Sequence, residues 1–152
     1  MIKKISYILI ILFFLHHCEY KPIYSDLNKT DFKINIIKVE GDSEMNNLVT
    51  SSIKKYSKKT SNKVYDLKIQ TKYTKENLIK NKKAETTTYL LSNEINFYVT
   101  NNEINKNYQF SETIKTKSNN NQFEFKKYES SVKNNFINSK INELILKLSN
   151  LK

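Results

Sequence analysis

The sequence predicts an α+β fold: a two-layer sandwich with a mainly antiparallel four-stranded sheet and two helices on one of its faces. Four segments alternate apolar with polar residues, and two others repeat apolar residues at spacings of three and four. Their order along the chain is strand, helix, three strands, helix. Each helix has one apolar stripe to bury, and one face of the sheet can cover both stripes. The opposite face is then left for solvent or a partner.

The first strand and the first helix are predicted on either side of the only glycine of the chain. Residues 32–39 alternate apolar with polar at most positions, which is typical of a half-buried strand. Gly41 ends this strand, and Asp42 or Ser43 can then cap a helix. The apolar stripe of this helix consists of Met45, Leu48, Val49, Ser52, Ile53 and Tyr56.

Three further strands are predicted in the middle of the chain. Residues 64–73 show the cleanest alternation, which indicates a strand with one apolar face. The polar residues 74–85 interrupt the pattern and predict a long hairpin tip. Alternation returns over residues 87–99, and a less regular strand follows at residues 108–114.

The C-terminal part of the chain predicts one long helix. Its apolar residues recur at helical spacing: Tyr128, Val132, Phe136, Ile137, Ile141, Leu144, Ile145, Leu148 and Leu151. The predicted polar face holds Lys133, Asn134, Lys140 and Lys147. A basic amphipathic helix can also lie on a membrane. A stripe of this regularity beside three consecutive strands favours packing against the sheet.

The N-terminus predicts export and a lipid anchor. Lys3 and Lys4 precede an apolar run over residues 5–15, which is the pattern of a secretory signal. This run has about half of the roughly 20 residues that a membrane-spanning helix needs. Cys18, the only cysteine, follows with Leu15 three positions before it, as in a bacterial lipoprotein signal. We therefore expect Cys18 to be lipidated.

The predicted organisation has three parts. Residues 1–17 form a lipoprotein signal peptide, residues 18–31 an arm attached to the lipid, and residues 32–152 a single α+β domain. Removal of the signal leaves 152 − 17 = 135 residues, an ordinary size for one domain. A single cysteine cannot form an internal disulfide, which excludes a disulfide framework.

The composition predicts a basic surface and disfavours catalysis. All 26 basic residues are lysines, and the formal charge of +11 becomes +9 without Lys3 and Lys4. Such a surface attracts anionic lipid headgroups or phosphorylated glycolipid. The lack of arginine, the usual bidentate reader of guanine and phosphate, disfavours nucleic acid. Both histidines precede Cys18, so we expect no enzyme, metal or cofactor. Chemistry by paired carboxylates stays open as the enzymatic alternative.

The residues Cys18-Glu19-Tyr20-Lys21-Pro22-Ile23-Tyr24 resemble the lipidated start of the LptE family of lipopolysaccharide-assembly lipoproteins. Members of that family commonly open Cys-Gly-(Phe/Tyr)-(Arg/Lys)-Pro-Leu-Tyr. The order of the predicted strands and the long C-terminal helix are also similar. The resemblance implies a non-enzymatic lipoprotein on the periplasmic face of the outer membrane. Such a protein plugs an LptD-like β-barrel, assists its assembly and binds lipopolysaccharide as it is inserted.

The resemblance also implies a set of functional residues. Cys18 is the expected lipid-attachment site. Lysines are the expected contacts to lipopolysaccharide, because the phosphates of lipid A are anionic; the candidates are Lys68, Lys72, Lys82 and Lys83. The same features fit an alternative, a lipid-anchored periplasmic scaffold or anionic-lipid-binding domain of another envelope pathway.

Overall fold

The computed structural model describes residues 31–57, 60–119 and 121–151. The elements in these ranges are β1 (Lys33–Gly41), α2 (Ser43–Ser57), β2 (Val64–Lys80), β3 (Thr86–Thr100), β4 (Asn105–Lys117) and α3 (Gln122–Ser149). The predicted α+β class and the predicted order of elements are confirmed. The predicted signal peptide, the lipid-attachment residue Cys18 and the arm up to residue 30 lie outside the described residues.

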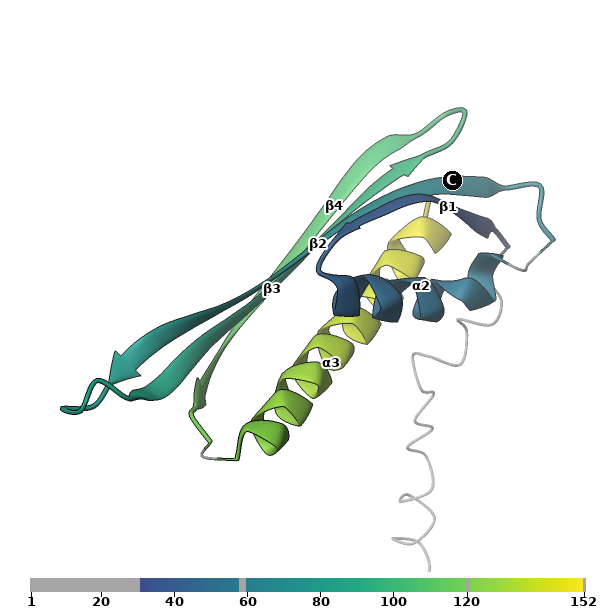
Figure 1. Ribbon diagram of the computed structural model, residues 1–152. Helices are drawn as coiled ribbons and strands as arrows, with labels where there is room; N and C mark the ends of the chain where they lie inside the picture. The colour runs from purple at the N-terminus through teal and green to yellow at the C-terminus, as the bar shows by residue number, and fades with distance from the viewer. Residues whose placement is uncertain (1–30, 58–59, 120, 152) are drawn as a thin grey trace, which may run out of the picture.

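The four strands form one mixed sheet in the order β1-β2-β3-β4. The pairs β2–β3 and β3–β4 are antiparallel, as predicted, whereas β1 pairs with β2 in parallel. A parallel pair needs a crossover connection between its strands, and α2 provides it. Both helices cover the same face of the sheet, and α3 crosses α2 on that face (Figure 1).

The turn from β1 into α2 depends on Gly41. Its φ is +113°, and a Cβ at this position would lie 1.8 Å from the carbonyl oxygen of Thr71. Any other residue would therefore collide with the backbone of β2. The next residue, Asp42, caps α2, because its Oδ1 accepts a hydrogen bond of 2.9 Å from the backbone N–H of Met45.

The predicted apolar stripes of both helices meet the inner face of the sheet in one core, apart from Tyr128 of α3, which is 41% exposed. Its largest fully buried side chains are Tyr56 of α2, Tyr65 of β2, Phe97 of β3 and Phe136 of α3. The edge strand β4 adds only partly buried side chains, such as Tyr108. This lighter burial agrees with its less regular sequence pattern.

The prediction of a long hairpin tip over residues 74–85 is wrong. β2 and β3 continue to pair as far as Lys80 and Thr86, so that the connecting turn spans only residues 81–85. The pairing contains register shifts between Asn77 and Ile79 and between Ile79 and Lys80. These bulges accommodate residues that break the alternation, so the ladder continues where the sequence pattern is lost.

Candidate functional site

The structure places the four candidate lysines in two separate groups. Lys68 and Lys72 are exposed in β2 and lie on the sheet face opposite the helices, because they alternate with the buried residues of that strand. Lys82 and Lys83 are exposed in the turn between β2 and β3. The distal part of β2 separates the two groups, so the structure does not bring these lysines together into one site.

The sheet face that the helices leave uncovered is polar and carries charges of both signs. Lys72 lies directly opposite Glu94 of β3. The hydroxyl group of Tyr98 donates a hydrogen bond of 3.2 Å to Oε1 of Gln70. A cavity of about 430 Å³ opens at this face near Lys72, Glu94 and Asn96. This surface, which we call the open face, offers donors and acceptors side by side rather than a concentrated positive charge.

The turn that carries Lys82 and Lys83 is ordered by hydrogen bonds to Asn81. The backbone N–H of Asn81 donates to the carbonyl oxygen of Glu85 at 2.9 Å. The side-chain oxygen of Asn81 accepts from the backbone N–H groups of Lys83, at 2.9 Å, and of Glu85, at 3.0 Å. Ala84 completes the turn with a φ of +62°. The two ammonium groups are therefore presented from a defined backbone, which lowers the entropy cost of binding a ligand.

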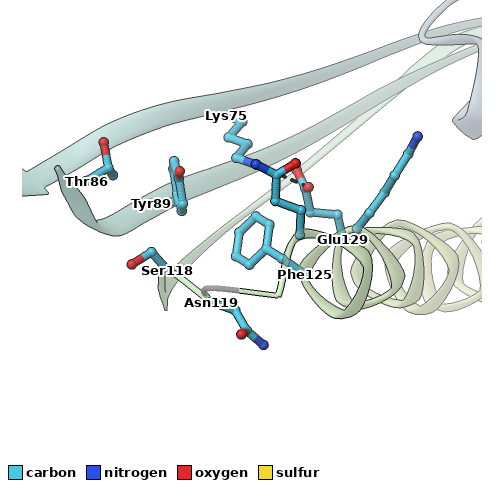
Figure 2. A pocket seen from close by; sticks show the side chains of 9 residues that line it. Lys75, Thr86, Tyr89, Ser118, Asn119, Phe125 and Glu129 are labelled. Atoms are coloured by element: carbon cyan, nitrogen blue, oxygen red, sulfur yellow. Dashed lines mark hydrogen bonds and ion pairs between the residues drawn. The ribbon is translucent and has the colours of Figure 1, made fainter.

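A cavity of about 570 Å³ lies near the turn, between the sheet and the first turns of α3 (Figure 2). Lys75 is central to it. The Nζ atom lies 4.5 Å from the ring centroid of Tyr89, 4.1 Å from that of Phe125 and 3.2 Å from Oε2 of Glu129. The carboxylate of Glu129 neutralises this cation and the rings surround it. Lys75 thereby fastens the hairpin to α3. No local pattern predicts this contact, because Glu129 lies 54 residues further along the chain.

Glu129 is shared between Lys75 and Tyr73. The hydroxyl group of Tyr73 donates a hydrogen bond to Oε1 of Glu129. Burial, and then this hydrogen bond, raise the pKa of Tyr73 above its ordinary value. Tyr73 therefore stays protonated at neutral and mildly alkaline pH, and it keeps the carboxylate of Glu129 oriented toward the hairpin.

The prediction that Lys133 lies on the polar face of the C-terminal helix is wrong. The residue is only 6% exposed. Its Nζ atom lies 2.9 Å from Oε2 of Glu44, 3.3 Å from Oδ1 of Asp42 and 4.0 Å from the ring centroid of Tyr73. The hydroxyl of Ser130 also donates to Glu44, and this bond, followed by the one from Lys133, lowers the pKa of Glu44. These contacts join α2 to α3 and are structural.

In residues 31–57, 60–119 and 121–151 no cluster of three or more His, Cys, Asp or Glu side chains could hold a metal ion. Among the helices in the same ranges, none has the length and apolar character needed to cross a membrane. The surface features that remain as candidates are the open face, the turn lysines and the cavity beside Lys75.

Comparison with known proteins shows the fold of this chain but no family. No family model matches the chain, and no curated protein matches it in sequence. Rare lipoprotein B from Shewanella oneidensis matches in structure with a TM-score of 0.56 at 11% identity, over 76% of this chain and 98% of that one. A protein from Caulobacter crescentus CB15 described as a lipoprotein matches with a TM-score of 0.52 at 8% identity, over 81% and 92%. The chain has the fold of these lipoproteins.

At 8% and 11% identity, these structures share the arrangement of strands and helices with this chain and no residue roles.

Proposed function

We propose that the protein is a non-enzymatic, lipid-anchored protein of the outer membrane that partners an LptD-type β-barrel and assists lipopolysaccharide transport and assembly. The fold carries the proposal, since the match extends over 98% of the structure of rare lipoprotein B. The sequence adds support, because Cys18 to Tyr24 resembles the lipidated start of the LptE family.

The surfaces of the described domain suit the two partners in different ways. The open face, with Lys72, Glu94 and Tyr98, offers the mixed hydrogen-bonding groups that a protein wall can match. Lys82 and Lys83 form no ion pair within the described part of the chain, and they suit the phosphates of lipid A. We assign the open face to the barrel and the turn to the lipid.

The test is site-specific photo-crosslinking in cells. A photoreactive residue replaces Lys72 on the open face or Lys83 in the turn, and a matched control replaces Thr50, an exposed residue of α2. Mass analysis identifies each adduct and the N-terminal peptide. We expect a β-barrel adduct from position 72, a lipopolysaccharide adduct from position 83, neither from position 50, and a mature chain that begins with acylated Cys18.

Other outcomes would redirect the assignment. An acylated Cys18 without a barrel adduct from the open face would favour the alternative, a lipid-anchored scaffold or anionic-lipid-binding domain of another envelope pathway. A chain that retains its leader and captures no barrel would refute the proposed LptE-like function.

A further inference from the structure

The distal end of the β2–β3 hairpin combines exposed apolar side chains with lysines. Leu78 is 43% exposed and Ile79 is 53% exposed, although both are large aliphatic residues. The next residue is Lys80, and Lys82 and Lys83 follow in the turn. Exposed apolar residues are common as single side chains. An adjacent pair at the end of a hairpin, followed by three lysines, is an amphipathic surface that we call the hairpin tip, residues 78–83.

Two lysines of β4 belong to the same surface, because the bulges in β2 place Ile79 in register with them. Ile79 lies opposite Thr88 of β3, and Thr88 lies opposite Lys117 of β4. Directly opposed residues in a sheet project from the same face, so Ile79 and Lys117 belong to one row. In the next row, Lys115 of β4 lies opposite Leu90. Two more ammonium groups thus flank Ile79 on the open face.

The local charge is strongly positive. Lys80, Lys82 and Lys83 in the hairpin, with Lys115 and Lys117 in β4, provide five positive charges, and Glu76 and Glu85 provide two negative ones. Glu85 already accepts a hydrogen bond of 2.7 Å from the side-chain amide of Asn81. Among the residues that the structure describes, none of the five lysines forms an ion pair. The ammonium groups are available to an anionic partner.

The hairpin tip is also held in place and projects from the rest of the domain. The sheet extends beyond α2 at this end, and α3 begins below it (Figure 1). Lys75 fastens β2 to α3 through Phe125 and Glu129 (Figure 2). The hydrogen bonds of Asn81 order the turn. A projecting, preorganised end can meet a flat surface without a change of fold.

We propose that the hairpin tip binds the surface of an anionic lipid bilayer and inserts Leu78 and Ile79 between the headgroups. Aliphatic side chains gain free energy at the boundary between headgroups and acyl chains. Lysines beside them are attracted by the negative potential of the leaflet, and their long stems reach headgroup phosphates while the apolar pair is immersed. This binding goes beyond the proposed function, because it requires neither a barrel nor lipopolysaccharide.

The chain provides a matched fluorescence test. It contains no tryptophan, so the Ile79→Trp variant carries a single indole. Ile37→Trp is the control, because Ile37 in β1 is 52% exposed, almost the same as Ile79 at 53%. The full chain is reconstituted into vesicles of phosphatidylcholine with or without phosphatidylglycerol. Brominated acyl chains, which quench indole within the bilayer, are placed either in these vesicles or in added acceptor vesicles. The two arrangements cover insertion into the host bilayer and into a second one.

We expect a blue shift and bromine quenching of the Ile79→Trp indole with phosphatidylglycerol, and much less of both with phosphatidylcholine alone. The Ile37→Trp indole should respond in neither. Each lysine near an anionic surface contributes about five-fold to partitioning, so changing Lys80, Lys82 and Lys83 to Gln should weaken it on the order of a hundredfold. The same charge change at Lys54, Lys55 and Lys106, away from the tip, should have little effect.

Three results would overturn the proposal: no quenching of Ile79→Trp in either arrangement, equal quenching of Ile37→Trp, or equal weakening by the two lysine triple variants. The vesicles contain no β-barrel and no lipopolysaccharide. A negative result would therefore remove bilayer insertion and leave the proposed function to its own crosslinking test.

Discussion

The buried ammonium group of Lys133 provides the sharpest test of how α2 and α3 are joined. The Lys133→Met change removes the charge and keeps most of the volume of the aliphatic stem, so that packing changes little. It takes away two contacts to carboxylates, with Glu44 at 2.9 Å and Asp42 at 3.3 Å, and the contact with the ring of Tyr73 at 4.0 Å. We expect the variant to fold with reduced stability.

The exposure of Asp42 and Glu44 determines how much unfolding free energy the Lys133→Met variant loses. The side chains of Asp42 and Glu44 are 24% and 43% exposed, against 8% for that of Lys133. Each pair therefore contributes about 1 kcal/mol, the upper end for surface pairs, rather than the roughly 3–5 kcal/mol lost when a fully buried pair is broken. The cation–π contact adds about 1 kcal/mol. The Met variant no longer buries an ammonium group, and this gain offsets part of the sum. The expected loss of unfolding free energy is about 2 kcal/mol.

Urea unfolding of the full chain in detergent, followed by circular dichroism, measures this loss. Lys127→Met, at an exposed position of the same helix, is the control and should change the unfolding free energy by less than about 0.5 kcal/mol. The double variant with Glu44→Gln should lose less than the sum of the two single variants, because both remove the same contact. A Lys133→Met variant as stable as the control, or additive losses, would refute the structural role.

Three further perturbations test other parts of the fold. Gly41→Ala should lower the free energy of unfolding by more than about 3 kcal/mol or prevent folding, because a Cβ would lie 1.8 Å from the carbonyl oxygen of Thr71. The control is Glu40→Ala, at the exposed position one residue earlier, which should change the free energy of unfolding very little in the same urea titration. Since the pKa of Glu44 is lowered in the folded state, its stabilisation is present above the ordinary pKa near 4.5 and is lost as pH falls through the folded pKa. The stability difference between the native chain and Glu44→Gln should therefore shrink below pH 4.5, and a constant difference would contradict the shift. Asn93→Leu should stabilise the protein by about 1 kcal/mol, because Asn93 is fully buried and its amide group has no hydrogen-bond partner among the described residues; a lower melting temperature would argue against this.

Local patterns predicted most of the fold, because each element presents one face to one core. The alternation over residues 64–73 and 87–99 and the stripe of α3 were sufficient for the order of elements and for the inner face of the sheet. The distal half of the hairpin was missed, since residues 74–80 lose the alternation at the bulges while their backbone pairing continues. A periodic pattern reports side-chain burial, and it cannot report a ladder whose side chains are exposed on both faces.

The candidate site was predicted less well, because charge patterns do not reveal which lysines have partners. The residue type of Lys133 predicts a position in solvent, yet Asp42 and Glu44, about ninety residues away, neutralise it. Charge makes Lys68 and Lys82 equal candidates, and only the structure shows that the length of β2 keeps them apart. The apolar half of the hairpin tip was missed because Leu78 and Ile79 fall within a stretch that appeared polar throughout.

The length of β2 separates the two ends of the protein by a fixed interval. Lys33 at the start of β1 lies beside Val64, the first of the 17 residues of β2, and Lys80 is the last. At roughly 3.3 Å per residue, the end where the N-terminal arm enters and the hairpin tip are about 50 Å apart along the strand. This exceeds the roughly 30 Å thickness of a hydrocarbon core. If Cys18 carries the proposed lipid, a sheet that stands upright on the bilayer would hold the lysines of the turn well away from its surface, whereas a sheet that lies flat would bring both ends to it. Under that proposal, the tilt of the sheet decides which bilayer the turn can reach.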